Sequence, residues 1–196
     1  MTTRSNILLA ALSVFGENGY ASTTMQAIRE KAGISNGSLF HFFPNKETLG
    51  ATLYLESILQ YQSGLLNALS TPKLDAHAGI HTLVRYHFDW VESHVLLARF
   101  LFERDLPDWG TSHTTSIRMA NHHTYRVIGE WLTLHMQAGK LRSQPISTCI
   151  ALLQGSTLVL SRAWLENTIP EKLKRHITPL SDALWAALRN EQESSA

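Results

Sequence analysis

Apolar residues recur at the three- and four-residue spacing of a helix face along almost the whole of this 196-residue chain. No segment shows the sustained alternation of polar residues with Val, Ile and Thr that is typical of a half-buried strand. With 44% apolar and 17% charged residues, the composition is that of a chain that packs a core. The sequence therefore predicts an all-α fold.

Residues that stop or restart helices divide this pattern into about nine segments. Thr23 and Gln26 form the Thr-x-x-Gln pattern of a capping box, and Ser35 and Asn45 are good N-cap residues for the next two helices. Short helices precede Pro44 and longer ones follow it, so we expect one domain over 1–44 and another over 45–196. The expected helices cover 4–18, 23–32, 35–43, 46–70, 75–92, 93–105, 111–137, 146–167 and 170–191.

The segment 25–43 has the layout of a helix-turn-helix: a helix of about two turns, a tight turn at Gly33 and a second helix. Five apolar residues are placed to pack these helices on each other and on the first helix: Ile28, Ala32, Ile34, Leu39 and Phe42. The second helix presents small, uncharged hydrogen-bonding groups outward, at Ser35, Asn36, Gly37, Ser38 and His41. Such groups suit close approach to DNA phosphates and to base edges in the major groove.

At this point the sequence resembles the DNA-binding domain of the TetR family of bacterial transcriptional regulators. The resemblance rests on the runs Asn18-Gly19-Tyr20, Ala32-Gly33-Ile34-Ser35 and Lys46-Glu47-x-Leu49, at consistent spacing over the first quarter of the chain. The later helices agree with the family in number, order and length. The resemblance implies a three-helix DNA-binding domain followed by a six-helix ligand-binding and dimerisation domain. It also implies a homodimeric repressor that a small molecule of unknown identity releases from double-stranded operator DNA.

The same resemblance assigns roles to individual residues. Thr24 and Lys46 match positions that contact backbone phosphate, and Lys46 also ties DNA binding to movement of the helix that it begins. The recognition positions are Ser35, Asn36, Gly37, Ser38, Phe40 and His41. Three residues depart from the family pattern, because Phe40 stands for a usual Tyr, Phe42 for a usual His or Tyr, and Arg29 for a usual Ala.

The segment up to Gly50, called the DNA-reading segment below, has little net charge with which to attract a polyanion. The whole chain has a formal net charge of +1. Up to Gly50 the basic residues Arg4, Arg29, Lys31 and Lys46 face three glutamates, which is again a net +1. Because affinity and salt dependence grow with the number of phosphates neutralised, we expect a shallow salt dependence per subunit and reliance on dimerisation.

The middle helices carry many aromatic and soft side chains, and bundle interiors lined by such residues hold ligands in other helical proteins. The family resemblance implies an effector site in this region. Any single one of these residues is more often plain core, since aromatic stripes at helical spacing mainly pack. The candidate ligand-binding residues are Tyr86, Trp90, Phe100, Trp109, Met119, His123 and Trp131.

The helix expected over 146–167 is apolar on more than one face and therefore needs two burial partners. Its own bundle supplies one, and a second copy of the chain is the natural other. A core formed wholly within one chain is the alternative. The candidate homodimer interface, from this helix and the last one, is Leu152, Gly155, Val159, Ala163, Leu184 and Leu188.

Other classes of protein are not favoured. The apolar window 150–165 is interrupted by polar residues and falls short of the roughly 20 residues of a membrane span, so we expect a buried helix and no membrane contact. The single Cys149 forms no intrachain disulfide, which fits the cytoplasm. The pairs His77/His81 and His122/His123 lack a third ligand at a diagnostic spacing, so no metal or cofactor is expected.

No nucleophile elbow, phosphate-cradling glycine loop or catalytic carboxylate pair is present, so we do not expect an enzyme. Two alternatives stay open. One is a small-molecule-binding helical dimer with weak or lost DNA binding, which Phe40, Phe42 and the low charge keep in view. The other is a helical enzyme with an unrecognised site.

Overall fold

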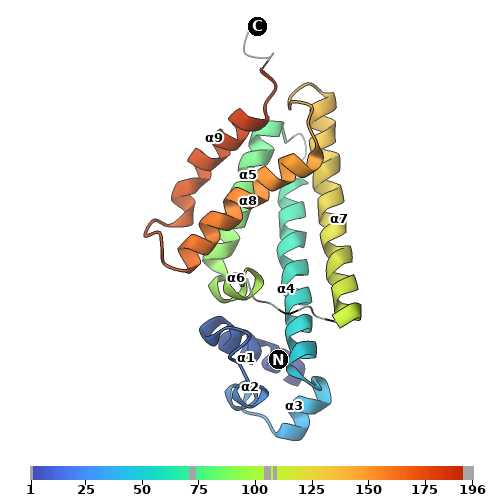
Figure 1. Cartoon of the computed structure of the whole chain (residues 1–196), viewed down its shortest axis with the longest axis vertical. Coiled ribbons are helices and arrows are strands. Elements are labelled where there is room, and N and C mark those ends of the chain that lie inside the picture. The colour runs from blue at the N-terminus through green and yellow to red at the C-terminus, as the bar shows by residue number, and fades with distance from the viewer. Residues whose placement is uncertain (1, 71–73, 104–106, 108–109, 192–196) are drawn as a thin grey trace. The chain divides into compact units, whose positions relative to one another are not determined.

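The computed structural model describes residues 2–70, 74–103, 107 and 110–191 (Figure 1). Over these residues it has nine α-helices, one short 3₁₀ helix and no strand, with a single isolated β-bridge between Leu141 and Arg189. The predicted all-α fold is confirmed. The helices are α1 Thr3–Asn18, α2 Met25–Ala32, α3 Asn36–Phe42, α4 Lys46–Leu69, α5 Ala76–Ser93, α6 Val95–Leu101, α7 Gly110–Gln137, α8 Ile146–Leu165, the 3₁₀ helix η1 Leu173–His176, and α9 Ile177–Leu188.

The contacts divide the chain into two compact units, which do not follow the predicted boundary after Pro44. The first unit comprises Met1–Gln60 and His94–Ala120, and the second comprises Tyr61–Ser93 and Asn121–Ala196. The first unit gains the start of α4 and all of α6 because their apolar side chains share a core with α1 to α3. The functional division at residues 44 and 45 stays a prediction.

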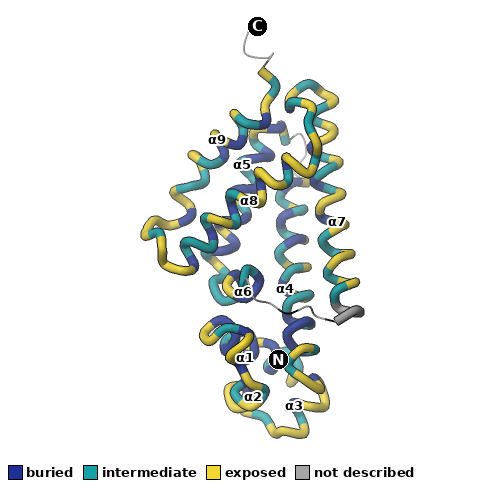
Figure 2. Tube along the Cα trace, in the orientation of Figure 1, coloured by how far each residue is buried: buried dark blue, intermediate teal, exposed yellow. Residues whose placement is uncertain are grey.

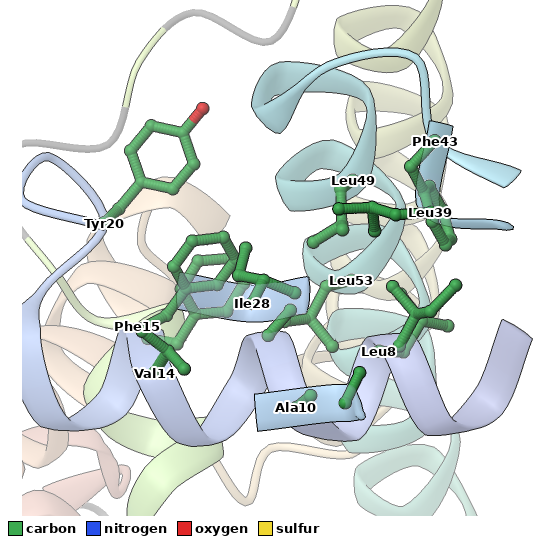
Figure 3. Packing of buried hydrophobic residues seen from close by; sticks show 14 of the residues in the cluster. Leu8, Ala10, Val14, Phe15, Tyr20, Ile28, Leu39, Phe43, Leu49 and Leu53 are labelled. Atoms are coloured by element: carbon green, nitrogen blue, oxygen red, sulfur yellow. The ribbon is translucent and has the colours of Figure 1, made fainter. Parts of the chain in front are cut away.

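The core of the first unit is built on one apolar face of α1 (Figure 3). Ile7, Ala11, Val14 and Phe15 are all buried there. Phe100 of α6 lies parallel to Phe15, with ring centroids 5.2 Å apart. This core holds the three short helices to one another and to α4, and so fixes how α3 is presented.

One core prediction in this unit is wrong. Phe43, which is 3% exposed, packs into the core, whereas Phe42 is 39% exposed. The chain leaves the helix at Phe43, whose extended backbone (φ −137°, ψ 102°) turns its side chain inward. The residue before a proline is pushed out of the helical region, which explains why the direction changes here.

The caps of the short helices differ in one case from those expected. The N-cap of α2 is Thr24, whose Oγ1 accepts from the Ala27 N–H at 3.1 Å, and not Thr23. Thr23 is buried and donates to the Gly19 carbonyl at 2.9 Å. Ser35 caps α3 as predicted, accepting from the Ser38 N–H at 3.1 Å.

In the second unit α5 packs against α8, α9 and η1. The last helix was expected from residue 170 but α9 begins at Ile177, after η1. A helix from residue 170 would place Pro179 in its interior, where the ring has no N–H to donate and clashes with the preceding turn. Beginning at Ile177 puts Pro179 in the first turn, where a proline is tolerated.

Candidate nucleic-acid interface and effector cavity

The recognition residues predicted on α3 lie on its outer face. Asn36, Gly37, Phe40 and His41 are exposed, and Phe40 keeps 44% of its surface in solvent (Figure 2). Ser38 is half-buried, and Ser35 is exposed although its Oγ caps the helix. The side of α3 that faces away from the core therefore presents neutral polar groups and one aromatic ring.

Gly37 leaves open space on this face. A Cβ built at Gly37 meets no atom within 4 Å, and its backbone does not have a positive φ. The fold therefore does not require glycine here, in contrast to Gly33, whose left-handed backbone (φ 64°, ψ 36°) makes the turn between α2 and α3. Absence of a side chain at Gly37 lets another molecule approach the backbone of α3.

Thr24 lies at the exposed N-terminus of α2, where a phosphate contact is expected. Its Oγ1 accepts from the Ala27 N–H, so the hydroxyl proton remains available to a phosphate oxygen. The first-turn N–H groups of a helix add to such a site, because they point toward an approaching anion.

Lys46, for which a phosphate contact is expected, points toward the turn between α1 and α2. Its ammonium donates to three backbone carbonyls, at Tyr20 (3.1 Å), Ala21 (3.1 Å) and Thr23 (2.9 Å). It also lies 4.6 Å from the centroid of the Tyr20 ring. A lysine has three N–H donors, so all three are used in tying α4 to the turn between α1 and α2.

The same turn is held from another side by Glu103, which follows α6. Both carboxylate oxygens of Glu103 lie within reach of the Tyr20 N–H, at 3.1 and 3.2 Å. Tyr20 thus has its carbonyl bound by α4 and its amide bound by the chain after α6. Burial and the nearby Glu47 carboxylate raise the pKa of the Tyr20 hydroxyl.

The other bases of the DNA-reading segment are also engaged. Arg4 lies 2.6 Å from Glu56, Arg29 lies 3.2 Å from Glu30, and Lys31 lies 3.7 Å from Glu17. These pairs are solvent-exposed, and such pairs are weak enough to be exchanged for a stronger partner. All four basic side chains of residues 2–50, the part of this segment that the structure describes, are therefore engaged within the chain.

A small cavity lies inside the second unit, with a volume of about 40 Å³. Four polar side chains reach it, from Tyr61, His87, Gln154 and Thr157. The rest of its wall is apolar and comes from α4, α5, α7 and α8, at Leu65, Leu83, Val84, Ile128, Ile150 and Leu153.

A chain of hydrogen bonds runs beside this cavity from α4 through α5 to α8. The Tyr61 hydroxyl lies 2.7 Å from His87 Nδ1, and His87 Nε2 lies 2.9 Å from the Ser161 hydroxyl. Burial lowers the pKa of His87 to about 4, against the opposing effect of a hydrogen bond to the Thr157 backbone. Burial, with the neighbouring Tyr86 and Tyr125, raises the pKa of Tyr61. The hydrogen-bonded series of Tyr61, His87 and Ser161 is therefore uncharged at neutral pH.

Of the predicted ligand-binding residues that the structure describes, none lines this cavity. Tyr86 and Trp90 lie one layer away, because the Tyr86 hydroxyl donates to the Tyr61 carbonyl at 2.8 Å and the Trp90 ring lies 4.9 Å from the Tyr61 ring. Phe100 is core of the first unit, Met119 is 68% exposed and His123 is exposed. Trp109 lies outside the described residues.

Trp131 lines a second, more open hollow of the same unit, of about 760 Å³. It shares this hollow with His77, His135 and Trp185, and its ring packs on Gly79 of α5. Within the described part of the chain, no group of three or more metal-ligating side chains is present.

The predicted dimer residues fall into two groups. Leu152 and Val159 of α8 are 38% and 67% exposed, and Gly155 between them is also exposed, so the described part of the chain leaves this face uncovered. Figure 2 shows the exposed stretches along α8. Ala163 is half-buried. Leu184 and Leu188 of α9 are buried inside the chain and so present no surface to a second copy. That part of the prediction was wrong.

Burial also corrects the expected character of α8. Of the described helices, α8 alone is long and apolar enough to cross a membrane by composition, with a mean hydropathy of 1.2, and only 22% of that window is buried. The sequence predicted a buried helix here, and that prediction is wrong because most of this window is not buried. The inner face of α8 carries the buried polar residues Thr157 and Ser161, which a lipid-facing helix would not favour.

Comparisons with known proteins agree with this geometry. Residues 7–51 match the family model described as bacterial regulatory proteins, tetR family, and these residues span α1, α2, α3 and the start of α4. Over these residues, which are the first part of the chain, the sequence is similar to the TetR family. Its resemblance to that family, first seen in residues of the same region, is confirmed.

Two curated relatives match the N-terminal part of this chain. The regulator UidR of Escherichia coli strain K12 is 44% identical over 54 residues, which is 28% of each chain. The transcriptional repressor KstR2 of Rhodococcus jostii is 31% identical over 90 residues, 46% of this chain and 44% of the relative. The chain thus spans less than half the length of these curated relatives. Both are named as regulators and neither as an enzyme, in agreement with the prediction that this protein is not an enzyme.

A solved structure matches nearly the whole chain. FadR from Bacillus subtilis, crystallised in complex with stearoyl-CoA, superimposes with a TM-score of 0.78 at 20% identity, covering 92% of this chain and 96% of that one. At this identity the likeness establishes the fold, including the six-helix body beyond the matched N-terminal segment.

The sequence offered one overlooked signal for the cavity. Thr157 and Ser161 stand four residues apart along an otherwise apolar helix, which places them on one inward face. His87 likewise stands among the buried Val84, Phe88 and Val91. A polar group on an apolar face needs a buried partner, and pairing these two faces would have located the network.

Proposed function

We propose that this protein is a homodimeric, DNA-binding transcriptional repressor that a small molecule releases from its operator. The observation that carries the proposal is the exposed face of α3, held by the core of a three-helix unit whose sequence matches the TetR family. A helix presented in this way enters the major groove with its N-terminal residues toward the base edges. Asn36 is suited to adenine, and Phe40 to the methyl group of thymine.

The proposed dimer supplies the second recognition helix. One helix-turn-helix reads only a half-site, and two-fold pairing places two of them one helical turn of DNA apart. The exposed apolar stripe of Leu152, Gly155 and Val159 supports α8 as the pairing helix, because the chain itself leaves it uncovered. Since few phosphates can be neutralised per subunit, useful affinity depends on both subunits binding at once.

Release by an effector requires a ligand that binds better to a conformer that does not fit DNA. The relative solved with stearoyl-CoA supports a small-molecule site in a body of this fold. Helix α4 begins at Lys46 in the first unit and continues to Tyr61 and Leu65, which line the cavity in the second unit. We propose that this helix links ligand binding to the turn that Lys46 holds. A regulator of this kind acts in the cytoplasm.

A second candidate is a small-molecule-binding dimer with weak or lost DNA binding. The inward-turned Lys46 favours it, since the expected phosphate contact is replaced by three backbone carbonyls.

Fluorescence anisotropy with DNA from upstream of the protein's own gene separates the two candidates. We expect sequence-selective binding that weakens with salt and is lost in the Asn36→Ala variant, while exchange of Thr133 on the exposed side of α7 for Ala leaves it unchanged. Equal affinity for operator and random DNA would eliminate the repressor proposal in favour of the second candidate.

Analytical ultracentrifugation tests the dimer. Val159→Arg puts a charge on the exposed stripe without disturbing the chain's own core, because Val159 is 67% exposed. We expect dissociation to monomers and at least tenfold weaker operator binding. Thr148→Arg, also exposed on α8, is the matched control for a new charge. A Val159→Arg protein that stays dimeric would place the interface elsewhere.

A further inference from the structure

The ammonium group of Lys46 is surrounded by one short stretch of the chain, although Lys46 is the first residue of α4. The carbonyl oxygens of Tyr20, Ala21 and Thr23 lie 3.1, 3.1 and 2.9 Å from Nζ, and the centroid of the Tyr20 ring lies 4.6 Å from it. Hydrogen bonds from a charged donor are shorter and stronger than those from a neutral one. Because an ammonium has three N–H donors, a phosphate could bind this nitrogen only by displacing one of the three carbonyls.

The bond to the Thr23 carbonyl is the one that bears on DNA. Thr23 immediately precedes Thr24, the N-cap of α2, so Lys46 binds the peptide unit that joins them. In a trans peptide the N–H points opposite to the carbonyl, so this bond turns the Thr24 N–H away from Lys46. Thr23 is also fixed by the α1–α2 turn, because its N–H donates to the Tyr20 carbonyl at 3.2 Å and its hydroxyl to the Gly19 carbonyl at 2.9 Å. The exposed Thr24 side chain is therefore carried by a peptide that is held from within the fold.

Glu103 holds the other end of the same turn. Its two carboxylate oxygens lie 3.1 and 3.2 Å from the Tyr20 N–H, and Lys46 binds the carbonyl of the same residue. Both side chains belong to the first unit. Residues 20–24 are thus positioned by charged groups that point toward the fold, while the N-terminus of α2 faces outward without a charge of its own.

We propose that Lys46 is a positioning residue for operator binding, which holds the start of α2 so that Thr24 meets a backbone phosphate, and that Lys46 itself makes no contact with the DNA. The charge of Lys46 then acts within the fold. The phosphate is bound by uncharged donors, namely the Thr24 hydroxyl and the first-turn N–H groups of α2. This role rests on the proposed function, because it describes how the operator is held.

Exchange of Lys46 for arginine separates the two roles, because it keeps the charge and changes the shape. A guanidinium is a planar fork that suits a phosphate, but it cannot place three donors at one point as a compact ammonium does. By fluorescence anisotropy, we expect Lys46→Arg to bind operator DNA about tenfold more weakly than the natural protein. Lys31→Arg is the matched control, since Lys31 is exposed and lies 3.7 Å from Glu17, and its affinity should not change. Full affinity in Lys46→Arg would overturn the proposal.

The salt dependence of binding gives a second measure. Each phosphate that a cation neutralises adds about 0.9 to the slope of log affinity against log salt concentration. We expect Lys46→Met to weaken operator binding while changing this slope by less than about 0.3, because no phosphate contact is lost. A slope that falls by about 0.9 would show that Lys46 neutralises a phosphate, and would overturn the proposal.

A double-mutant cycle tests whether Lys46 acts through Thr24. Thr24→Val keeps the shape of the side chain and removes the hydroxyl, and two residues that act through one contact have effects that do not add. In the Thr24→Val protein, Lys46→Arg should therefore weaken binding by less than about threefold, against about tenfold alone. In His41→Ala, which changes an exposed residue of α3, the full loss should remain. Equal losses in the two backgrounds would exclude a role through Thr24.

Circular dichroism at the assay temperature shows that each variant is folded, so that weaker binding does not report unfolded protein. If Lys46→Met does not fold, Lys46→Arg and the cycle decide the role. The outcomes also separate this role from the proposed function. Absence of selective operator binding by the natural protein would remove both, whereas selective binding that Lys46→Arg retains in full would remove the positioning role alone.

Discussion

The outer face of α3 and the cavity beside His87 both rely on uncharged hydrogen-bonding groups, but they are built in opposite ways. The face of α3 is set by neighbours in sequence, since Ser35 caps the helix three residues before Ser38. The cavity network joins residues 26 and 74 positions apart. The α3 groups stand in water and lose little when changed, whereas each member of the buried network leaves a costly unpaired partner. Changes on α3 should therefore alter binding alone, and changes at the network should alter stability.

The largest effect is expected at Gly37. Gly37→Leu should lower operator affinity by about a hundredfold or more, because the side chain fills the space that α3 leaves for DNA. Stability should stay the same or rise by up to about 1 kcal/mol, since glycine is a poor helix former. Anisotropy and urea unfolding measure the two effects. Unchanged operator binding would show that this part of α3 does not approach DNA.

His87 should make stability fall in acid. Its pKa is lowered to about 4 in the folded protein, against an ordinary value of 6.5, so only the unfolded chain gains a proton between these values. The contribution is complete above pH 6.5 and is lost progressively as pH falls toward 4, by about 3 kcal/mol in total. Urea unfolding at pH 7, 6, 5 and 4.5 measures the slope. His87→Gln should flatten it, and His123→Gln, at an exposed site, should not.

Lys46 should matter more to folding than its exposure suggests. Lys46→Met removes the donor of three carbonyls and should destabilise the first unit by roughly 2 kcal/mol. Lys31→Met is the control, because the exposed Lys31–Glu17 pair at 3.7 Å should contribute less than about 0.5 kcal/mol. Equal unfolding free energies for the two variants would refute the tie between α4 and the α1–α2 turn.

The smallest effect is expected at Glu103. Glu103→Ala leaves the Tyr20 N–H without its acceptor and should cost about 1 kcal/mol. Glu103→Gln, which keeps an acceptor oxygen, should cost less than half of that. Denaturant midpoints of the three proteins test the order, and a Gln variant as unstable as the Ala variant would mean that charge, not the hydrogen bond, is what counts.

Much of the first unit could be predicted because its determinants are local. The positive φ of Gly33, the Ser35 and Asn45 caps and the apolar face of α1 each depend on residues within a few positions. Where prediction failed, the adjacent residue took the predicted role. Thr24 replaced the adjacent Thr23 as a cap, and Phe43 replaced the adjacent Phe42 in the core.

The dimer face and the cavity were predicted less completely, because the residues that contact one another there are distant in sequence. The spacing of α8 indicated two apolar faces, and one is indeed uncovered, but only packing shows that Leu184 and Leu188 belong to the chain's own core. The aromatic content of the middle helices did not single out Tyr61 and His87. Those two are distinguished by a hydrogen bond, which depends on how α4 and α5 rotate against each other.

By itself, then, the sequence determined the helices, the turn at Gly33, the neutral outer face of α3 and the family to which that region belongs. Tertiary structure alone decided that Lys46 turns inward to three carbonyls, that Glu103 holds Tyr20, and that Tyr61, His87 and Ser161 form one buried network. The physical reason is the range of the interactions. Caps and apolar periodicity act within a turn or two of helix, whereas the partner of a buried polar group is chosen by the packing of the whole core.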